Sequence, residues 1–188
     1  MNFYILAGGH SSRMGQNKAL LKVDGLTLIE KIIKAVPAGE ADKIKIVTNS
    51  PEDYRFLSYD RIPDFFPGCG PISGVHAGLV DSSTPFNFFL ACDLPFLSQE
   101  LISEIIHQHQ GQTIFGVKTE DGLQPLCTIY SKSCVPMIEK MIREQNFSLH
   151  HLIASVNGKF IEMKCRSEFF NVNTLVDWIS LRRQKGEN

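Results

Sequence analysis

Short apolar runs alternate with amphipathic segments along almost the whole chain, and this alternation restricts the possible folds more than any other feature. Residues 3–7 and 87–91 form nearly continuous apolar runs, which are typical of strands buried on both faces of a sheet. Residues 26–36 place apolar side chains at helical spacing, with Thr27 as the expected N-cap and Pro37 directly after them. Strands that alternate with helices form right-handed βαβ units. The sequence therefore predicts an α/β fold, with a mostly parallel central sheet and helices on both faces.

The same patterns place the remaining elements. Further strands are expected at residues 43–48, 61–62, 113–117, 126–130 and 160–163. Further helices are expected at residues 75–80, 98–109 with Ser98 as N-cap, 133–143, 148–154 and 175–183. The glycine- and proline-rich residues 65–74 are expected to form a shaped loop. A chain of 188 residues without repeats or linkers fits one domain over residues 1–188, with a frayed polar tail at about 182–188.

The composition argues against several kinds of partner. The formal net charge is −1, so the chain has no overall attraction to nucleic acid or to an anionic membrane. The most apolar stretch, residues 85–97, is interrupted by Asn87 and Asp93 and is too short to span a bilayer. The five cysteines are odd in number and contain no C-x-x-C pair, which favours reduced thiols over a disulfide scaffold or a zinc ribbon. No signal peptide pattern is visible at the start, and we expect a cytoplasmic protein.

The loop after the first strand carries glycines and two cations. Ligands in an open α/β sheet bind beyond the carboxyl ends of the strands, and residues 6–18 lie at such an end. Gly8 and Gly9 let backbone N–H groups approach a phosphate closely. Arg13 can contact two phosphate oxygens with its planar guanidinium, while Lys18 supplies a compact charge. A solvated turn with two surface cations is the alternative, but the clustering of glycine, arginine and lysine favours a phosphate site.

The spacing within this loop excludes two common nucleotide motifs. Five residues separate Gly9 from Gly15 and two more precede Lys18, whereas the Walker A motif needs four residues and then Gly-Lys. Ala19 also stands where that motif requires serine or threonine. Residues 68–74 contain three glycines, but the third is one position late for G-x-G-x-x-G and the segment does not follow the first strand. A P-loop and a dinucleotide fingerprint are therefore not supported.

Asp93 stands at the end of the apolar run 87–91. A buried carboxylate without a partner is unfavourable, and a hard divalent cation would stabilise it. Mg²⁺ on phosphates typically takes one or two protein carboxylates and completes its shell with water. The alternative is that Asp93 caps a turn by accepting backbone N–H bonds before Pro95. We predict that Asp93 is a magnesium ligand, because the same fold also contains the predicted phosphate-binding loop, and Mg²⁺ accompanies bound phosphates.

Several short motifs occur in a characteristic order: Leu6-Ala7-Gly8-Gly9, Ser12-Arg13-Met14-Gly15, Lys18, Gly70-Pro71-Ile72-Ser73-Gly74, Asp93-Leu94-Pro95 and Asn171-Val172-Asn173-Thr174. In this order the chain resembles the MobA family, the molybdenum cofactor guanylyltransferases, from Tyr4 to about Trp178. The first motifs are shared with related pyrophosphorylases and cytidylyltransferases, so they are specific for the superfamily and weak for the substrate. The segment that contains Asn171 and Asn173 favours molybdopterin as the acceptor.

The resemblance implies a single Rossmann-like domain that binds GTP and Mg²⁺, transfers GMP to the phosphate of molybdopterin and releases pyrophosphate. It further implies transient contact with molybdenum-insertion proteins and molybdoenzyme apoproteins. The contacts with the nucleotide, carried over by position, involve Leu6, Ala7, Gly8, Gly9, Lys18, Asn49, Asp64 and Asp93. The catalytic groups implied are Arg13 and Lys18 on the phosphates and Asp93 on the metal.

The two asparagines near the C-terminus are the predicted acceptor contacts. Asn171 and Asn173 are two residues apart, so in an extended chain their side chains face the same side. Their amides suit a metal or a polar ligand. A turn before the last helix, with Thr174 as its N-cap, is the alternative, and both interpretations can hold together.

Three other functions remain open from the sequence. A cytidylyltransferase would use CTP on the same molybdenum cofactor. A related enzyme of this fold would act on a sugar phosphate or on methylerythritol phosphate. A non-catalytic nucleotide-binding protein that delivers cofactor is the most distant alternative, and the metal carboxylate Asp93 argues against it.

Overall fold

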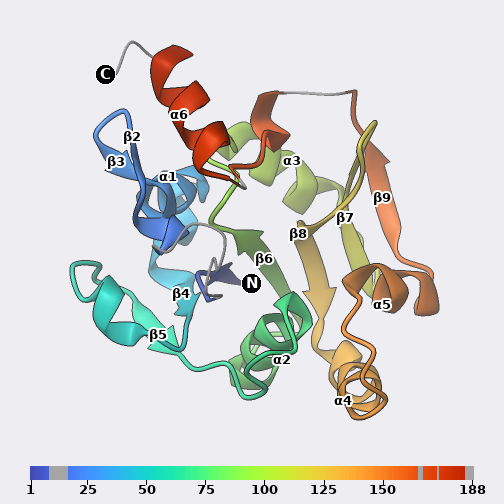
Figure 1. Ribbon diagram of the computed structural model, residues 1–188. Coiled ribbons are helices and arrows are strands. Elements are labelled where there is room, and N and C mark those ends of the chain that lie inside the picture. Colours follow the sequence, from blue (N-terminus) through green and yellow to red (C-terminus); the bar gives the residue numbers. More distant parts are fainter. Residues whose placement is uncertain (9–16, 165–166, 173, 185–188) are drawn as a thin grey trace.

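The computed structural model describes residues 1–8, 17–164, 167–172 and 174–184 (Figure 1). Within these residues, a central sheet of seven strands has the order β5-β4-β1-β6-β8-β7-β9. The strands are β1 (Asn2–Leu6), β4 (Ile44–Val47), β5 (Asp60–Ile62), β6 (Phe86–Ala91), β7 (Ile114–Thr119), β8 (Gly122–Ser131) and β9 (Lys159–Glu162). Strand β8 runs antiparallel to β6 and β7, and all other neighbours are parallel. The prediction of a mostly parallel sheet is confirmed.

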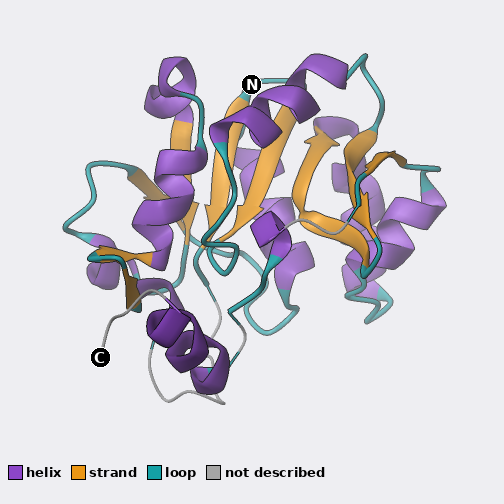
Figure 2. Ribbon diagram, turned by 90° about the horizontal axis from the view of Figure 1, so that it is seen from above, coloured by secondary structure: helices purple, strands orange, loops and turns teal. Residues whose placement is uncertain are grey.

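Helices cover both faces of this sheet (Figure 2). They are α1 (Leu28–Ala35), α2 (Pro71–Asp81), α3 (Gln99–Gln108), α4 (Val135–Arg143), α5 (Leu149–Ser155) and α6 (Leu175–Gln184). Helices α1 and α3 contribute to one apolar cluster, and α2, α4 and α5 contribute to a second cluster on the other face. Short 3-10 helices lie at η1 (Lys18–Leu20), η2 (Ala38–Lys43), η3 (Pro51–Tyr54), η4 (Lys132–Cys134) and η5 (Ser167–Phe169). None of the described helices has the length and apolarity needed to cross a bilayer.

The predicted N-caps are confirmed. The Thr27 hydroxyl accepts the Glu30 N–H, and the Glu30 carboxylate accepts the Thr27 N–H at 2.8 Å, so α1 begins with a capping box. These hydrogen bonds hold the pKa of Glu30 below its usual value. Ser98 caps α3 in the same manner by accepting the Leu101 N–H.

One local prediction was wrong, and one hairpin was not predicted. Helix α2 begins at Pro71 rather than at residue 75, because proline is well suited to the first turn of a helix and Gly70 supplies the positive φ (72°) that precedes it. The strands β2 (Lys22–Val23) and β3 (Leu26–Thr27) form a hairpin that the sequence analysis missed. Its turn, Asp24-Gly25, has positive φ at both residues, as a two-residue hairpin loop requires. The Asp-Gly pair was the available signal for it.

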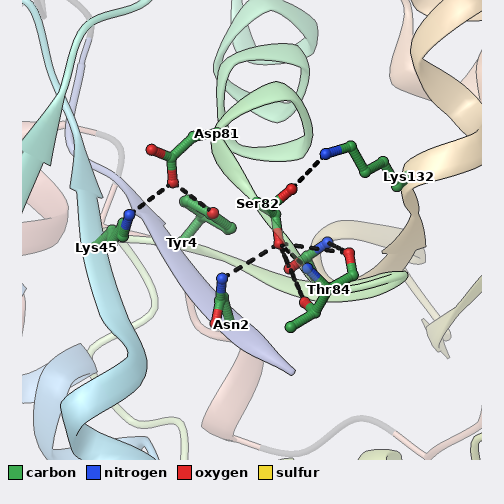
Figure 3. Close-up of polar contacts among 8 residues, drawn as sticks. Asn2, Tyr4, Lys45, Asp81, Ser82, Thr84 and Lys132 are labelled. Carbon is green, nitrogen blue, oxygen red and sulfur yellow. Dashed lines mark hydrogen bonds and ion pairs between the residues drawn. The ribbon is translucent and has the colours of Figure 1, made fainter.

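A polar network joins the C-terminal end of α2 to the amino-terminal edge of the sheet (Figure 3). The Tyr4 hydroxyl donates to the Asp81 carboxylate at 2.8 Å, and the Lys45 ammonium pairs with the same oxygen at 2.9 Å. Lys132 donates to the carbonyl of Ser82. Burial and the Asp81 carboxylate raise the pKa of Tyr4, so its hydroxyl keeps its proton. These contacts fix α2 against the sheet at the edge opposite the carboxyl ends of the strands.

A side chain at Gly78 is expected to destabilise the protein. A Cβ atom there would lie 2.6 Å from Cε1 of Phe89 and 2.8 Å from Cγ of Tyr4, and these two buried rings are stacked at 5.2 Å. We expect Gly78→Ala to lower the free energy of unfolding by about 1–3 kcal/mol through overpacking, despite a gain of up to about 1 kcal/mol in helix propensity. Urea denaturation measures this loss. Gly39→Ala is the control, because no atom lies within 4 Å of its Cβ position. An unchanged midpoint for Gly78→Ala would contradict the packing described.

Candidate active site

The candidate site lies where the carboxyl ends of three neighbouring parallel strands meet. Leu6, the last residue of β1, pairs with Val47 at the end of β4 and with Ala91 at the end of β6. The segments that follow these strands therefore begin side by side (Figure 1). The Ala7 N–H donates to the Val47 carbonyl at 3.0 Å, which extends the pairing by one residue. This edge of an open α/β sheet is where ligands bind.

Two predicted site residues meet at this edge although 75 positions separate them. The Lys18 ammonium, on η1, lies 3.0 Å from Oδ2 of Asp93, which follows β6. The side chains are 15% and 22% exposed, so both charges are largely withdrawn from water. An ion pair compensates each charge for the hydration that it loses there. The predicted phosphate cation and the predicted metal carboxylate thus belong to one cluster.

The second carboxylate oxygen of Asp93 is buried and has no hydrogen-bond partner among the described residues. Asp93 also lines a cavity of about 210 Å³, together with residues of β6, of β8 and of the chain before α6: Ala91, Leu94, Gln124, Pro125, Leu126 and Asn171. A buried carboxylate oxygen without a donor is unfavourable unless a ligand or a cation satisfies it. Mg²⁺ fits this oxygen, because it binds through one or two carboxylates and completes its shell with water and substrate phosphates.

Asn49 and Asp64 follow β4 and β5 and are hydrogen-bonded to each other. The Asn49 side-chain oxygen accepts the Asp64 N–H at 2.9 Å. The Asp64 carboxylate accepts the Phe66 N–H at 2.9 Å and the hydroxyl of Ser73 in the first turn of α2. The structure therefore brings together the two predicted nucleotide contacts that follow β4 and β5, and it anchors them to α2.

Asn171 lies beside Asp93 as part of the lining of the same cavity. The Val172 N–H donates to the Asp93 carbonyl at 3.0 Å, which fixes this segment next to the end of β6. Thr174 caps α6, since its hydroxyl accepts the Asp177 N–H at 3.1 Å and the Asp177 carboxylate accepts the Thr174 N–H at 2.7 Å. The segment therefore contains the predicted helix cap at Thr174 and also places Asn171 in the cavity lining.

Comparison with known proteins identifies the family to which this chain belongs. The family described as MobA-like NTP transferase domain matches residues 3–159. This chain belongs to the MobA-like NTP transferase family. The resemblance stated from the sequence motifs is confirmed, and the protein is a nucleotidyltransferase.

Relatives of this MobA-like chain extend the match over nearly its whole length. A protein of Flavobacterium johnsoniae, named probable molybdenum cofactor guanylyltransferase, is 37% identical over 92% of this chain and 90% of its own. A protein of Desulfosudis oleivorans, named molybdenum cofactor guanylyltransferase, is 33% identical over 90% of this chain and 88% of its own. The crystal structure of molybdopterin-guanine dinucleotide biosynthesis protein A from Archaeoglobus fulgidus superimposes with a TM-score of 0.81 over 99% of each chain, at 20% identity. The last similarity supports the fold alone.

Three predicted site residues of this MobA-like chain lie outside the described residues. These are Gly9, Arg13 and Asn173. Their contacts with phosphate, or with the acceptor in the case of Asn173, remain predictions from the sequence. Leu6, Ala7 and Gly8 are described and lie at the carboxyl end of β1, as expected.

Gln124, a polar residue of the cavity lining, was not predicted from the sequence, and the neighbouring Cys92 is a protonated thiol. Gln124 lines the cavity from β8, where its side-chain amide donates to the Thr119 hydroxyl at 3.1 Å. The apolar pattern predicted this strand only from residue 126, and no motif marks Gln124. Cys92 precedes Asp93, and burial, with the Asp93 carboxylate, raises its pKa to about 12. Cys92 is therefore a neutral thiol near pH 7.

Proposed function

We propose that this MobA-like protein transfers GMP from GTP to the phosphate of molybdenum-loaded molybdopterin and releases pyrophosphate, with Mg²⁺ as cofactor. The observation that carries the proposal is the Lys18–Asp93 pair beside a cavity, in which one carboxylate oxygen is buried and has no hydrogen-bond partner in the part of the chain that the structure describes. The names of the relatives support guanylyl transfer as the reaction. We infer further that residues 1–188 act as one domain in the cytoplasm.

The proposed reaction depends on positioning and charge stabilisation more than on a general base. The terminal phosphate of the acceptor is already an anion at neutral pH. One of its oxygens forms a bond to the α-phosphorus of GTP. The bond between the α-phosphorus and the bridging oxygen breaks, and pyrophosphate leaves with that electron pair. Electrostatic stabilisation of the α-phosphoryl group and of the leaving group therefore supplies most of the rate.

The described residues divide these tasks between them. Lys18 would bind the phosphates of GTP as a compact cation, and Asp93 would hold Mg²⁺ through the oxygen that has no partner among the described residues. The metal ion, when bound, neutralises phosphate charge and orients the α-phosphoryl group. The backbone of Leu6, Ala7 and Gly8, together with Asn49 and Asp64, contacts the nucleotide. Gly9 and Arg13, which lie between Gly8 and Asn17 in the sequence, would bind the phosphates as the family resemblance implies.

The cavity beside Asp93 is the proposed acceptor side of the reaction. Asn171 and Gln124 offer amide groups to it, and Leu94, Pro125 and Leu126 line the rest. Amides suit the many hydrogen-bonding groups of a pterin, because each amide both donates and accepts. Asn173 is the second predicted acceptor contact. Molybdenum-insertion proteins and molybdoenzyme apoproteins are the partners that would supply and receive the cofactor.

Pyrophosphate release from GTP, CTP, ATP and UTP tests the proposal. Each nucleotide is supplied with Mg²⁺, with and without molybdenum-loaded molybdopterin. We expect pyrophosphate release only with GTP and molybdopterin together. Release should be lost when EDTA removes the metal, because the positive charge that neutralises the phosphates comes from the cation at Asp93. Excess Mg²⁺ should restore the activity.

The other outcomes separate the alternatives. Release with CTP in place of GTP would make the product the cytosine dinucleotide. Release with a sugar phosphate or methylerythritol phosphate in place of molybdopterin would change the acceptor class. Binding of nucleotide without release from any pair would favour a cofactor-delivery protein. Full activity in EDTA would contradict the role of Asp93 as a metal ligand.

A further inference from the structure

We propose that the hydroxyl of Tyr54 is a positioning group that holds Ala7 and Asn17 together beneath the nucleotide site, and so sets the place of Lys18 relative to the backbone after β1. Ala7 and Asn17 lie at the two ends of the glycine-containing segment in the sequence, one directly after β1 and the other directly before η1. The inference rests on the proposed function, because it assigns Tyr54 to the binding of GTP. None of the sequence motifs includes Tyr54.

One buried hydroxyl contacts both ends of this segment. Tyr54 is the last residue of η3 and is fully buried. Its hydroxyl donates to the Ala7 carbonyl at 2.8 Å and accepts from the Asn17 side-chain amide at 2.9 Å. The Asn17 side-chain oxygen accepts the Ala19 N–H at 3.2 Å and thereby caps η1, in which Lys18 is the first residue. A continuous path of hydrogen bonds thus runs from the end of β1 to the helix that carries Lys18.

Further hydrogen bonds hold Tyr54 and its surroundings in place. The Arg61 guanidinium, on β5, donates to the carbonyls of Tyr54 at 3.3 Å and of Leu57 at 3.0 Å. The Asn17 amide donates in addition to the Asp53 carboxylate at 2.8 Å. Burial raises the pKa of Tyr54, so its hydroxyl stays protonated and remains a donor. Tyr54 is therefore a fixed support attached to the sheet.

The arrangement matters for nucleotide binding because both supported ends lead to groups that contact GTP in the proposed function. The Ala7 N–H is bonded to Val47, so Ala7 is fixed to the sheet, and the Tyr54 hydroxyl transmits that position to Asn17. Lys18 follows Asn17, and its ammonium lies 3.0 Å from Asp93. Without the hydroxyl, Asn17 and Lys18 lose their link to Ala7. Part of the binding free energy is then spent on ordering these residues, and the affinity for GTP falls, because preorganised groups bind more tightly than mobile ones.

The first test replaces Tyr54 by phenylalanine, which keeps the buried ring and removes the hydroxyl. We expect the dissociation constant of GTP with Mg²⁺, measured calorimetrically without acceptor, to rise about five- to tenfold, as for one buried hydrogen bond. The KM for GTP should rise in parallel, while kcat and the KM for molybdopterin stay within about twofold. Tyr4→Phe is the matched control, because Tyr4 is equally buried and its hydroxyl donates to Asp81 at the opposite edge of the sheet. It should lower the melting temperature and leave GTP affinity unchanged.

The second test uses Asn17→Ser, which retains an N-cap oxygen for Ala19 and removes the amide that reaches Tyr54. We expect a similar loss of GTP affinity, and a double variant with Tyr54→Phe that binds no more weakly than the weaker single variant, because both changes break one path. If the losses of GTP affinity in the two single variants add in the double variant, the two residues do not act through one path.

The wild-type protein separates the two possible failures. Absence of GTP binding and turnover in wild-type protein, with another NTP accepted, would refute the guanylyl assignment, and the variants are then compared with that NTP. Equal affinity of folded Tyr54→Phe and wild-type protein for the accepted nucleotide overturns the positioning role. The same applies if Tyr4→Phe weakens binding as much as Tyr54→Phe.

Discussion

Replacement of Asp93 by asparagine is expected to lower turnover about 10³-fold and to leave the fold intact, because the variant loses a metal-binding charge and keeps the side-chain shape. One oxygen of this carboxylate pairs with Lys18, and the other is buried beside the cavity with no partner among the residues that the structure describes. We therefore expect a substrate or a cation to complete the contacts of this carboxylate. An amide cannot attract Mg²⁺ to the same extent, so the negative charge of the α-phosphoryl group would not be neutralised during transfer.

Pyrophosphate release with GTP, Mg²⁺ and loaded molybdopterin measures the effect of Asp93→Asn, and circular dichroism with a thermal melt checks the fold. Asp60→Asn is the control, since Asp60 is an exposed carboxylate at the amino end of β5, away from the site edge. This variant should retain wild-type turnover. A folded Asp93→Asn protein with wild-type turnover would show that Asp93 serves the ion pair with Lys18 and nothing further.

The sequence predicts the place of Asp93 and Lys18 well for a physical reason. The apolar runs that became β1 and β6 are buried on both faces, so their lengths and ends are visible without tertiary information. The carboxyl ends of parallel strands meet at one edge of a sheet, and residues that follow such strands become neighbours whatever their separation in the chain. The fold class and the cluster of Lys18 with Asp93 therefore follow from local patterns and one topological rule.

Other parts of the site depend on contacts that local patterns do not encode. Tyr54 stands in a polar segment, Pro51–Tyr54, yet it is fully buried because its ring packs into the core on the α1 face of the sheet. Gln124 joins the cavity because β8 begins at Gly122, earlier than its apolar run indicates. The bond between Asn49 and Asp64 joins two loops that the sequence treats separately. In each case tertiary packing, rather than propensity, determines the position.

The two edges of the sheet differ in how their charges are satisfied. At the amino-terminal edge, Asp81 receives both the Tyr4 hydroxyl and the Lys45 ammonium, so its contacts come from the protein itself. At the carboxyl edge, Asp93 shares one oxygen with Lys18 and leaves the other without a donor among the described residues. The first arrangement stabilises the fold, whereas the second is expected of a site that a ligand completes.

Removal of the Lys18 charge is expected to be the second most damaging change. Lys18→Met keeps most of the aliphatic side chain, which is largely buried, and removes the ammonium. We expect kcat/KM for GTP to fall about 30- to 100-fold, as for a lost hydrogen bond to a charged group, with most of the change in KM. In the proposed function Lys18 would contact the phosphates in both the ground state and the transition state, so we expect its loss to weaken binding more than the transfer step. Steady-state kinetics at saturating molybdopterin separate the two parameters.

The same substitution has an opposite effect on the metal, which gives it a second, independent readout. Without the ammonium at 3.0 Å, no other side chain of the described residues is ion-paired with Oδ2 of Asp93, so the free variant should bind Mg²⁺ more tightly than wild-type protein does. Titration with Mn²⁺ as a paramagnetic probe, in the absence of nucleotide, measures this gain. Lys18→Arg keeps the charge but replaces the compact ammonium by a planar guanidinium, and it should fall between wild type and Lys18→Met in both measurements. Equal kcat/KM and equal metal affinity in Lys18→Met would place Lys18 outside both the phosphate contact and the charge balance of Asp93.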